Sequence, residues 1–506
     1  MVDEDYGAAI VESLKNHDCY NHPVERIEVL ETHISWVLLT GRYAYKIKKP
    51  VNFGFLDFST LEKRRRFCEE ELRLNSRLAP DLYLEVTPVT GSIENPKIGG
   101  EGKAIEYAVK MKEFPQEAQL NRMMIKGLVT SGMIDEIALY ISRFHQSVRA
   151  APAKSPFGTP ETILNAALGN FSLLKELVKQ SEDLELIEEI EKWSAREHKA
   201  RIGSFIKRKK EGFIRECHGD IYLGNMALIG GEVTIFDCIE FNEYFHWIDV
   251  INDAGFLVMD LQDHKRFDLA RRFLNNYLEA TGDYSSLSVL RFYLSYRAMV
   301  RVKVAVIKMN EPKMRAQAKK RIWIEYRGYL ALARRYMHDP KPTLIITHGV
   351  SGSGKTTYTQ SIVERVGAVR IRSDVERKRL FGLNPLDKSN SQPGENIYSK
   401  AANEKTYRRL ASLAITIIKA GYSVVIDASF LKRNDRKMFY DLSKRVNVPF
   451  SILDFKVDEQ QLRSRIMARE KAANDPSEAT VKIMEKQLQS DEELTNEEMK
   501  FVTTIQ

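Results

Sequence analysis

The sequence has few cysteines, no long apolar run and no internal repeat, and each absence removes a class of protein. Its four cysteines, Cys19, Cys68, Cys217 and Cys238, form no CxxC pair, so neither a disulfide framework nor a zinc site is expected. No apolar segment reaches the roughly 18 residues that a membrane-spanning helix needs, and the N-terminus is acidic where a signal peptide is basic. We therefore expect a cytoplasmic protein without a membrane partner.

A large excess of one charge is also missing. The chain has 77 Lys and Arg against 69 Asp and Glu, for a net charge of +8 over 506 residues. This balance permits an anionic ligand without demanding nucleic acid. Two basic runs, at 63–66 and 207–210, lie far apart, and their composition predicts solvated helix faces. The apolar fraction of 43% is that of a globular protein, and the length suggests about three compact units.

The chain divides at two prolines, Pro340 and Pro342, which follow a long amphipathic stretch and end its helix. Residues 336–342 are therefore predicted to be a linker. Ahead of it, the pattern is α+β and bilobal, with a sheet-bearing lobe at 1–114 and a helical lobe at 115–335. The strands of the first lobe are expected at 26–39, 44–48, 83–89 and 105–111, with a hairpin tip at 99–102.

Beyond the linker, short β-rich runs alternate with helical stretches, at 343–347, 368–372, 423–426, 450–457 and 500–505. Strands that alternate with helices predict a parallel sheet covered by helices. We therefore expect residues 343–506 to form an α/β domain with a parallel five-stranded sheet.

A phosphate-binding loop opens this last domain. Residues 349–356 read GVSGSGKT and fit GxxxxGK[ST], between an apolar strand and a helical stretch. The glycines let backbone N–H groups surround phosphates, the lysine reaches the terminal phosphates, and the threonine hydroxyl binds Mg²⁺. The predicted nucleotide site consists of Gly349, Ser351, Gly352, Ser353, Gly354, Lys355, Thr356 and Thr357.

Two carboxylates follow at predicted strand ends, where open α/β sheets bind ligands. Asp374 can take the proton of an attacking hydroxyl, and Arg377, one helical turn later, can orient a phosphate or an acidic group. Asp427 stands where a Walker-B carboxylate would hold the metal. The alternatives are an N-cap aspartate with a surface arginine, and an ordinary strand-end aspartate.

Several arginines then lie within three turns of a charged helical stretch. Arg463, Arg465 and Arg469 suit a mobile lid that clamps the transferring phosphate, with a solvated helix face as the alternative. Residues 343–506 resemble the small P-loop kinases of the gluconate kinase, phage-type polynucleotide kinase and zeta-toxin group. The resemblance rests on 349–356, on the quartet 374–377 and on the strand ending at Asp427, and it implies an ATP- and Mg²⁺-dependent kinase.

A second constellation lies earlier in the chain. Residues 218–225 read HGDIYLGN and match HxDxxxxN, and Asp237 follows across a hairpin-like segment with Gly230 and Gly231 at its turn. In kinase-like phosphoryl transfer this order supplies a base and then two metal ligands. The predicted base is Asp220, the metal ligands are Asn225 and Asp237, and His218 supports the loop.

A lysine and a glutamate upstream complete this second set. Side chains two residues apart on a strand share a face, so Lys46 and Lys48 point the same way and one of them can reach phosphates. We favour Lys46, which sits deeper in the apolar alternation, paired with Glu71 rather than Glu70 from the following helix. The alternative is a basic strand edge beside an acidic surface run.

Together these residues resemble the aminoglycoside phosphotransferase family, within the protein-kinase-like fold, over about residues 25–330. The branch that is fused to a P-loop kinase has a signature similar to 236–242, FDCIEFN, with Asp249 and Asp253 beyond it. One departure is that no GxGxxG loop precedes Lys46.

The leading hypothesis is a bifunctional ATP- and Mg²⁺-dependent phosphotransferase for a small molecule with a hydroxyl group. The alternatives are a kinase regulated by a pseudokinase-like half, and a nucleic-acid end kinase. No stripe of basic and aromatic residues near Asp374 favours the last. The sequence does not indicate the acceptor or the oligomeric state.

Overall fold

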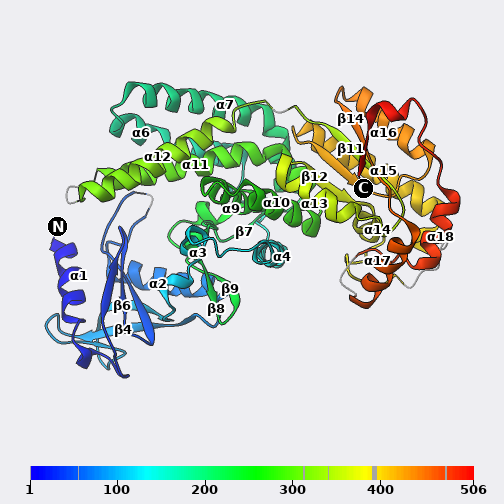
Figure 1. Ribbon diagram of the computed structural model, residues 1–506. Coiled ribbons are helices and arrows are strands. Elements are labelled where there is room, and N and C mark those ends of the chain that lie inside the picture. The colour runs from blue at the N-terminus through cyan, green and yellow to red at the C-terminus, as the bar shows by residue number, and fades with distance from the viewer. Residues whose placement is uncertain are drawn as a thin grey trace. The chain divides into compact units, whose positions relative to one another are not determined.

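The computed structural model describes residues 2–54, 56–310, 314–339, 341–389, 396–472 and 476–505 (Figure 1). They form two compact units, Met1–Ala167 with Phe205–Asp260, and Leu168–Ser204 with Leu261–Gln506. The second unit thus includes helices from the stretch 261–335 that the sequence assigned to the helical lobe. The domain boundaries at 114, 335 and 343 remain predictions from the sequence.

The first unit begins with helix α1, Val2–Ser13, and contains a six-stranded antiparallel sheet in the order β1-β2-β3-β6-β4-β5. All four predicted strand regions are present. The hairpin tip expected at 99–102 is wrong, because β5 pairs with β4 and not with β6; the tip lies where Gly91 pairs with Pro96. The strands are β1 Glu28–Glu31, β2 Ser35–Leu39, β3 Tyr43–Lys48, β4 Tyr83–Gly91, β5 Pro96–Ile98 and β6 Ala104–Lys112.

Helix α2, Leu61–Asn75, crosses this sheet (Figure 1). It begins where the Thr60 hydroxyl accepts a hydrogen bond from the Lys63 amide, which satisfies one of the open N–H groups of the first turn. Its inner face includes Cys68, Glu71 and Leu74, which are fully buried. Burial of this face against β4 and β6 fixes the position of Glu71 above the sheet.

The rest of the first unit holds short elements around two small antiparallel pairs. Strands β8 and β9 form the predicted hairpin with Gly230 and Gly231 at its turn, and β7 pairs with β10. The elements are α3 Leu120–Ile125, α4 Ser131–Ser147, α5 Pro160–Leu168, β7 Ile214–Glu216, β8 Met226–Ile229, β9 Glu232–Ile235, α8 Glu243–His246, β10 Trp247–Asp249 and α9 Val250–Asp263.

The second unit contains the predicted parallel five-stranded sheet, in the order β12-β13-β11-β14-β15. Its strands are β11 Leu344–His348, β12 Val369–Arg372, β13 Val424–Asp427, β14 Phe450–Phe455 and β15 Val502–Ile505. The helices that follow these strands are α13 Lys355–Val366, α14 Ser373–Leu380, α15 Lys400–Lys419, α16 Arg433–Arg445, α17 Glu459–Ala472 and α18 Val481–Ser490.

Helices from before the linker pack in this same unit. Helix α11 lies along α12, and α10 lies against α13 and β12. These helices are α6 Phe171–Leu177, α10 Phe267–Thr281, α11 Leu287–Met309 and α12 Ala316–Arg335. Over the described ranges, no helix is both long and apolar enough to cross a membrane. The four cysteines are buried and carry free thiols.

Both basic runs lie on helices, 63–66 on α2 and 207–210 on α7 (Ser181–Lys210), but they are not wholly solvated as expected. Arg64 is buried and its Nε lies 2.9 Å from Glu106 Oε2. Arg208 is buried as well, with Nε 2.7 Å and Nη2 2.8 Å from the two carboxylate oxygens of Asp249. In each run one arginine turns inward because a buried carboxylate from elsewhere in the chain faces it.

The Arg208–Asp249 pair yields a stability prediction. Arg208→Ala leaves the Asp249 charge buried without its main partner, which costs about 3–5 kcal/mol in the free energy of unfolding of the first unit. The neighbouring Lys207→Ala is the control, because the Lys207 side chain is 65% exposed and its Nζ lies 3.8 Å from Glu211; it should change stability by less than about 0.5 kcal/mol. Scanning calorimetry of the full chain compares the two, and equal effects would refute the assignment.

Candidate functional site

The first candidate site is built around two lysines on the inner face of β3. Lys46 Nζ lies 2.7 Å from Glu71 Oε1 and 2.6 Å from Asp237 Oδ1. Lys48 Nζ lies 2.7 Å from the other oxygen of Glu71. Burial would raise the pKa of Glu71, but the two lysines outweigh it and hold the pKa below its ordinary value. The favoured pair of Lys46 with Glu71 is therefore present, and Glu70 instead pairs with Arg73.

The loop at 218–225 brings three of the predicted residues together. Asn225 Nδ2 donates to Asp220 Oδ2 over 2.9 Å, so the amide orients this carboxylate. His218 Nε2 lies 2.9 Å from the Phe236 carbonyl oxygen, and its Nδ1 accepts from the Asp220 amide over 3.2 Å. Burial lowers the pKa of His218, which suits a neutral ring with its proton on Nε2. His218 thus supports the loop as the sequence predicted.

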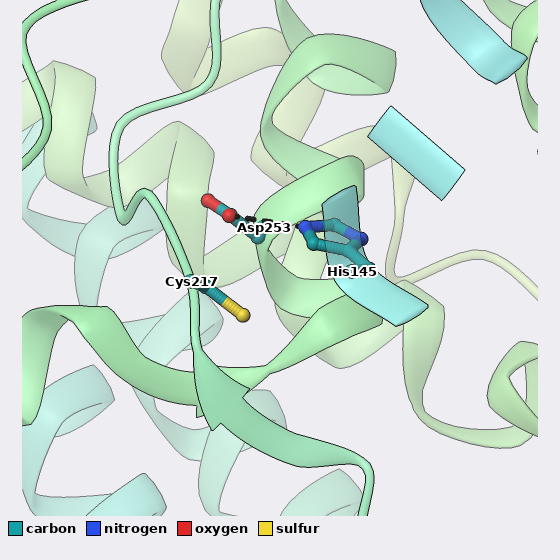
Figure 2. Close-up of side chains that lie close together, drawn as sticks. All are labelled: His145, Cys217 and Asp253. Carbon is teal, nitrogen blue, oxygen red and sulfur yellow. Dashed lines mark hydrogen bonds and ion pairs between the residues drawn. The ribbon is translucent and has the colours of Figure 1, made fainter. Parts of the chain in front are cut away.

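A buried aspartate from α9 holds the start of this loop. Asp253 Oδ2 accepts from the His218 amide over 2.9 Å, and Oδ1 accepts from the Gly219 amide over 2.9 Å. His145 of α4 contacts the same carboxylate, with its Nε2 3.2 Å from Oδ2 (Figure 2). Gly219 has φ +91°, and a Cβ there would meet the Phe245 carbonyl oxygen at 2.5 Å, so this turn requires glycine.

Cys217 lies beside His145 and Asp253, and their ligand atoms are within 4.8 Å of one another (Figure 2). The three have the chemistry of metal ligands. However, both oxygens of Asp253 already accept hydrogen bonds from the loop, so the cluster fits an anchor better than a metal site. The sequence drew attention to Asp253 but assigned it no role, because its partners are backbone amides that no motif records.

Asp237 differs from its buried neighbours in exposure and backbone conformation. Its side chain is 44% exposed, and its φ of 65° lies in the left-handed region that non-glycine residues rarely adopt. The Tyr83 hydroxyl oxygen accepts a hydrogen bond from its amide over 3.2 Å. The Asp237 carboxylate thus contacts Lys46 and is also accessible to solvent. Together with the amide oxygen of Asn225, it offers the hard oxygen donors that Mg²⁺ prefers.

The second candidate site is the phosphate loop of the second unit. Gly349, Gly352 and Gly354 all have positive φ, which curls the loop at the start of α13. Lys355 Nζ lies 2.9 Å from the Gly349 carbonyl oxygen and 2.7 Å from that of Val350. The loop carbonyls thus hold the ammonium group against the backbone of the loop.

The predicted metal ligands of this site are in contact. Thr356 Oγ1 donates to Asp427 Oδ2 over 2.7 Å. Asp427 ends β13 and lies in register with Arg372 at the end of β12. Hydroxyl and carboxylate oxygens suit Mg²⁺, and the phosphate loop, Asp427 and the start of α14 all lie at the carboxyl edge of the sheet. Thr357 is exposed one residue further along α13.

Asp374 lies in the first turn of α14 and Arg377 lies in its last turn. Arg377 is buried; its Nη1 donates to the Ile397 carbonyl oxygen over 2.9 Å, and its guanidinium lies 5.2 Å from the centre of the Tyr398 ring. Burial, together with the charge of Asp374, raises the pKa of Tyr398. Asp374 is partly exposed, so it can meet an acceptor that Arg377 could not reach without moving.

The lid arginines lie differently from one another. Arg463 Nη2 is 2.6 Å from Glu459 and 2.7 Å from Glu485, so two glutamates hold it in this structure. Arg465 borders the phosphate loop instead, since a Cβ on Gly354 would lie 3.5 Å from its Nη1. The Arg469 side chain lies outside the described residues.

One contact of the phosphate loop was not foreseen. Gln487 of α18 accepts a hydrogen bond from the Ser351 amide over 2.8 Å. No sequence motif marks this glutamine, because it is brought to the loop only by the packing of α18.

The regions that carry the two sites have known folds. A lysine on an antiparallel sheet, a glutamate on the helix that crosses it, the loop at 218–225 and Asp237 form a protein-kinase-like arrangement. The parallel sheet with its phosphate loop is a P-loop α/β domain, and residues 344–494 match the family model described as an AAA domain. Both predicted folds are confirmed.

Known proteins resemble most of the chain. The uncharacterized proteins Rv2004c and MT2060 of Mycobacterium tuberculosis are each 31% identical over 415 residues, which cover 81% of this chain and 80% of theirs. Among solved structures, amicoumacin kinase hAmiN, in complex with AMP-PNP, Ca²⁺ and Ami, covers 65% of this chain and 94% of its own at 12% identity, with a TM-score of 0.41. A gluconokinase from Sinorhizobium meliloti 1021 covers 33% and 83%, at 21% identity and a TM-score of 0.23.

Lys355 provides a test of the phosphate loop. Lys355→Ala removes the charge nearest the phosphates and should lower turnover at this site by at least about 10²-fold, as expected for loss of preorganised electrostatic stabilisation. Lys419→Ala, at the C-terminal end of α15, is the control. The measurement is ATP consumption together with binding of a fluorescent ATP analogue. Nucleotide binding in the first unit should persist, and its complete loss in a folded variant would contradict two separate sites.

Proposed function

We propose that this chain, which belongs to the same family as the mycobacterial proteins Rv2004c and MT2060, is a bifunctional ATP- and Mg²⁺-dependent phosphotransferase acting on small molecules with hydroxyl groups. The observation that carries the proposal is the presence of two sets of phosphate-handling side chains, one in each compact unit. Each set combines a positioned lysine, oxygen donors for a metal and a carboxylate suited to accept a proton.

In the first unit, Asp220 acts as the base that takes the proton of the acceptor hydroxyl. Asn225 orients its carboxylate, and Asp253 and His218 hold the loop that carries it. Lys46 brings positive charge to the nucleotide phosphates, and Asn225 and Asp237 would hold Mg²⁺. When bound, the metal neutralises the charge that develops on the transferring phosphoryl group. The protein residues supply positions and charges rather than covalent chemistry.

In the second unit, the curled loop and Lys355 bind the terminal phosphates, and Thr356 and Asp427 would hold Mg²⁺. Asp374 takes the acceptor proton at the same edge of the sheet. Arg377 is buried one helical turn away and would have to leave its contacts with Ile397 and Tyr398 before it could orient an acidic or phosphorylated acceptor. Lys355 and Arg465, which borders the loop, stabilise the transferring phosphate through charge, which is the main source of catalysis in this reaction class.

A small-molecule acceptor is favoured for both centres, and the cytoplasm is the compartment we propose. The similar solved structures include a kinase of amicoumacin and a gluconokinase. A second candidate, a regulatory first unit without turnover, has one observation in its favour. The turn between β1 and β2, where kinases carry a glycine-rich loop, reads Thr32, His33, Ile34.

The test of the proposal is a screen of ATP consumption over pooled sugars, amino alcohols, aminoglycosides, nucleosides and RNA ends. Wild-type protein is compared with Lys355→Ala and with Asp220→Asn. An acceptor whose turnover only Asp220→Asn removes belongs to the first unit, and one that only Lys355→Ala removes belongs to the second. If every acceptor depended on Lys355 alone, the regulatory candidate would replace bifunctionality.

Asp374→Asn separates proton transfer from nucleotide binding. The amide keeps the shape but cannot accept the acceptor proton, so turnover at the second centre should fall by about 10²-fold or more. The affinity for ATP should stay within about threefold, because the side chain does not contact the phosphates in this assignment. Titration with a fluorescent ATP analogue beside the turnover assay measures both. A comparable loss of affinity would make Asp374 a metal or structural residue.

Asp220 and Asp237 should fail in different ways. In full-length protein carrying Lys355→Ala, Asp220→Asn should still bind Mg²⁺·ATP and stop at chemistry. Asp237→Asn should lose metal-dependent nucleotide binding as well, because it removes a ligand charge. Calorimetric titration with and without Mg²⁺ measures both, and the full chain is used because a fragment ending at 340 would cut the second unit. Identical behaviour of the two variants would overturn the assigned roles.

A further inference from the structure

The second lysine of β3 has no part in the roles assigned so far. Lys48 is 1% exposed, and its Nζ contacts Glu71 Oε2 at 2.7 Å and also contacts Glu240 Oε1. It lies 4.8 Å from the centre of the Phe58 ring. A buried ammonium group between two buried carboxylates is costly to desolvate, and it persists only where its hydrogen bonds are satisfied.

The charges in this cluster support one another. Although burial lowers the pKa of Lys48, the charges of Glu240 and Glu71 raise it above its ordinary value. Burial raises the pKa of Glu240, and Lys48 opposes that rise. Lys48 is therefore charged in the folded protein, and its nearest partners are the two glutamates.

The decisive feature is how Glu71 uses its two oxygens. Oε1 accepts from Lys46 and Oε2 accepts from Lys48, each over 2.7 Å. A carboxylate bound at both oxygens cannot rotate without breaking one of these bonds. Lys48 thereby fixes the direction in which Glu71 presents Oε1 to Lys46, the lysine that also reaches Asp237.

Glu240 extends this restraint to another segment. It lies three residues beyond Asp237, so its contact with Lys48 attaches the segment that carries the proposed metal ligand to β3. Lys48 thus connects three parts of the site: the strand that carries Lys46, helix α2 through Glu71, and the segment at 237–240 through Glu240.

We propose that Lys48 and Glu240 are a positioning pair, which keeps Lys46, Glu71 and Asp237 assembled before nucleotide binds. This inference rests on the proposed function of the first unit. The pair acts through Glu71 and through the segment at 237–240 rather than by touching the phosphates. It accounts for two lysines on one strand face, of which one meets the ligand and the other holds the first in place.

The test uses full-length protein carrying Lys355→Ala, so that Mg²⁺-dependent binding of an ATP analogue reports on the first unit. Lys48→Met keeps the length of the side chain but removes its charge, and it should weaken binding by about tenfold, the effect of losing one coupled contact in a charged network. Lys48→Arg should recover most of the affinity. Lys49→Met is the matched control, because Lys49 pairs with the exposed Glu31 at 2.5 Å and not with Glu71 or Glu240 in the contacts described above. The affinity of this variant for the ATP analogue should not change.

Melting temperature is measured for every variant, and binding is titrated well below it. A purely structural role would lower the melting temperature of Lys48→Met and leave the affinity of the folded protein within about twofold, which would overturn the proposal. Should Lys48→Met fail to fold, Glu240→Gln keeps the shape and removes one charge; weaker binding by this variant supports the pair, and unchanged binding overturns it. If the Lys355→Ala parent itself bound no Mg²⁺·nucleotide, the proposed function of the first unit would fail, and the inference with it.

Discussion

One constraint acts in both units: the ammonium group of a partly buried lysine needs hydrogen-bond partners, because leaving it unpaired would be costly. Each unit supplies such partners to the lysine that the proposed function assigns to the phosphates. In the first unit the partners are carboxylates, Glu71 and Asp237, which hold Lys46 through charge. In the second, the carbonyl oxygens of Gly349 and Val350 and the Ser353 hydroxyl are among the groups that accept hydrogen bonds from Lys355. The first arrangement depends on charged side chains from separate elements, and the second depends in part on the curled backbone of the loop.

The irregular loops of the first unit also depend on hydrogen-bond partners that other elements supply. A loop that has left the sheet still has backbone N–H groups to satisfy, and buried side chains on helices supply the acceptors. Asp253 accepts from His218 and Gly219, Asp260 accepts from Leu223 over 2.9 Å, and Asn75 accepts from Cys238 over 2.9 Å. The buried polar residues on these helices therefore stabilise the loop by accepting its backbone hydrogen bonds. A packed core of apolar side chains alone could not hold this loop in one conformation.

The parts of the site that the sequence predicted are those in which spacing along the chain carries the information. The phosphate loop and the loop at 218–225 are continuous in sequence, and the five parallel strands follow from short apolar runs between helical stretches. The features that the sequence failed to predict have a different cause. Arg64 and Arg208 are buried because Glu106 and Asp249 face them from distant elements, and β5 turns back on β4 against expectation. Long-range partners decide such positions, and neither propensity nor periodicity records them.

The boundary near 342 shows the same limit. Helix α12 ends at Arg335 and β11 begins at Leu344, yet helices from before the two prolines belong to the same compact unit as the parallel sheet. Strand β12 is the edge of the parallel sheet, where unpaired backbone groups invite another chain. Helix α10, from before the linker, covers this edge: Asn275 accepts from the Arg370 amide over 2.7 Å, and Arg271 donates to the carbonyl oxygens of Glu364 and Arg365. Arg370 in turn donates to the Thr356 carbonyl oxygen over 2.9 Å. The threonine of the phosphate loop therefore contacts an edge strand that is covered by a helix from the region before the linker.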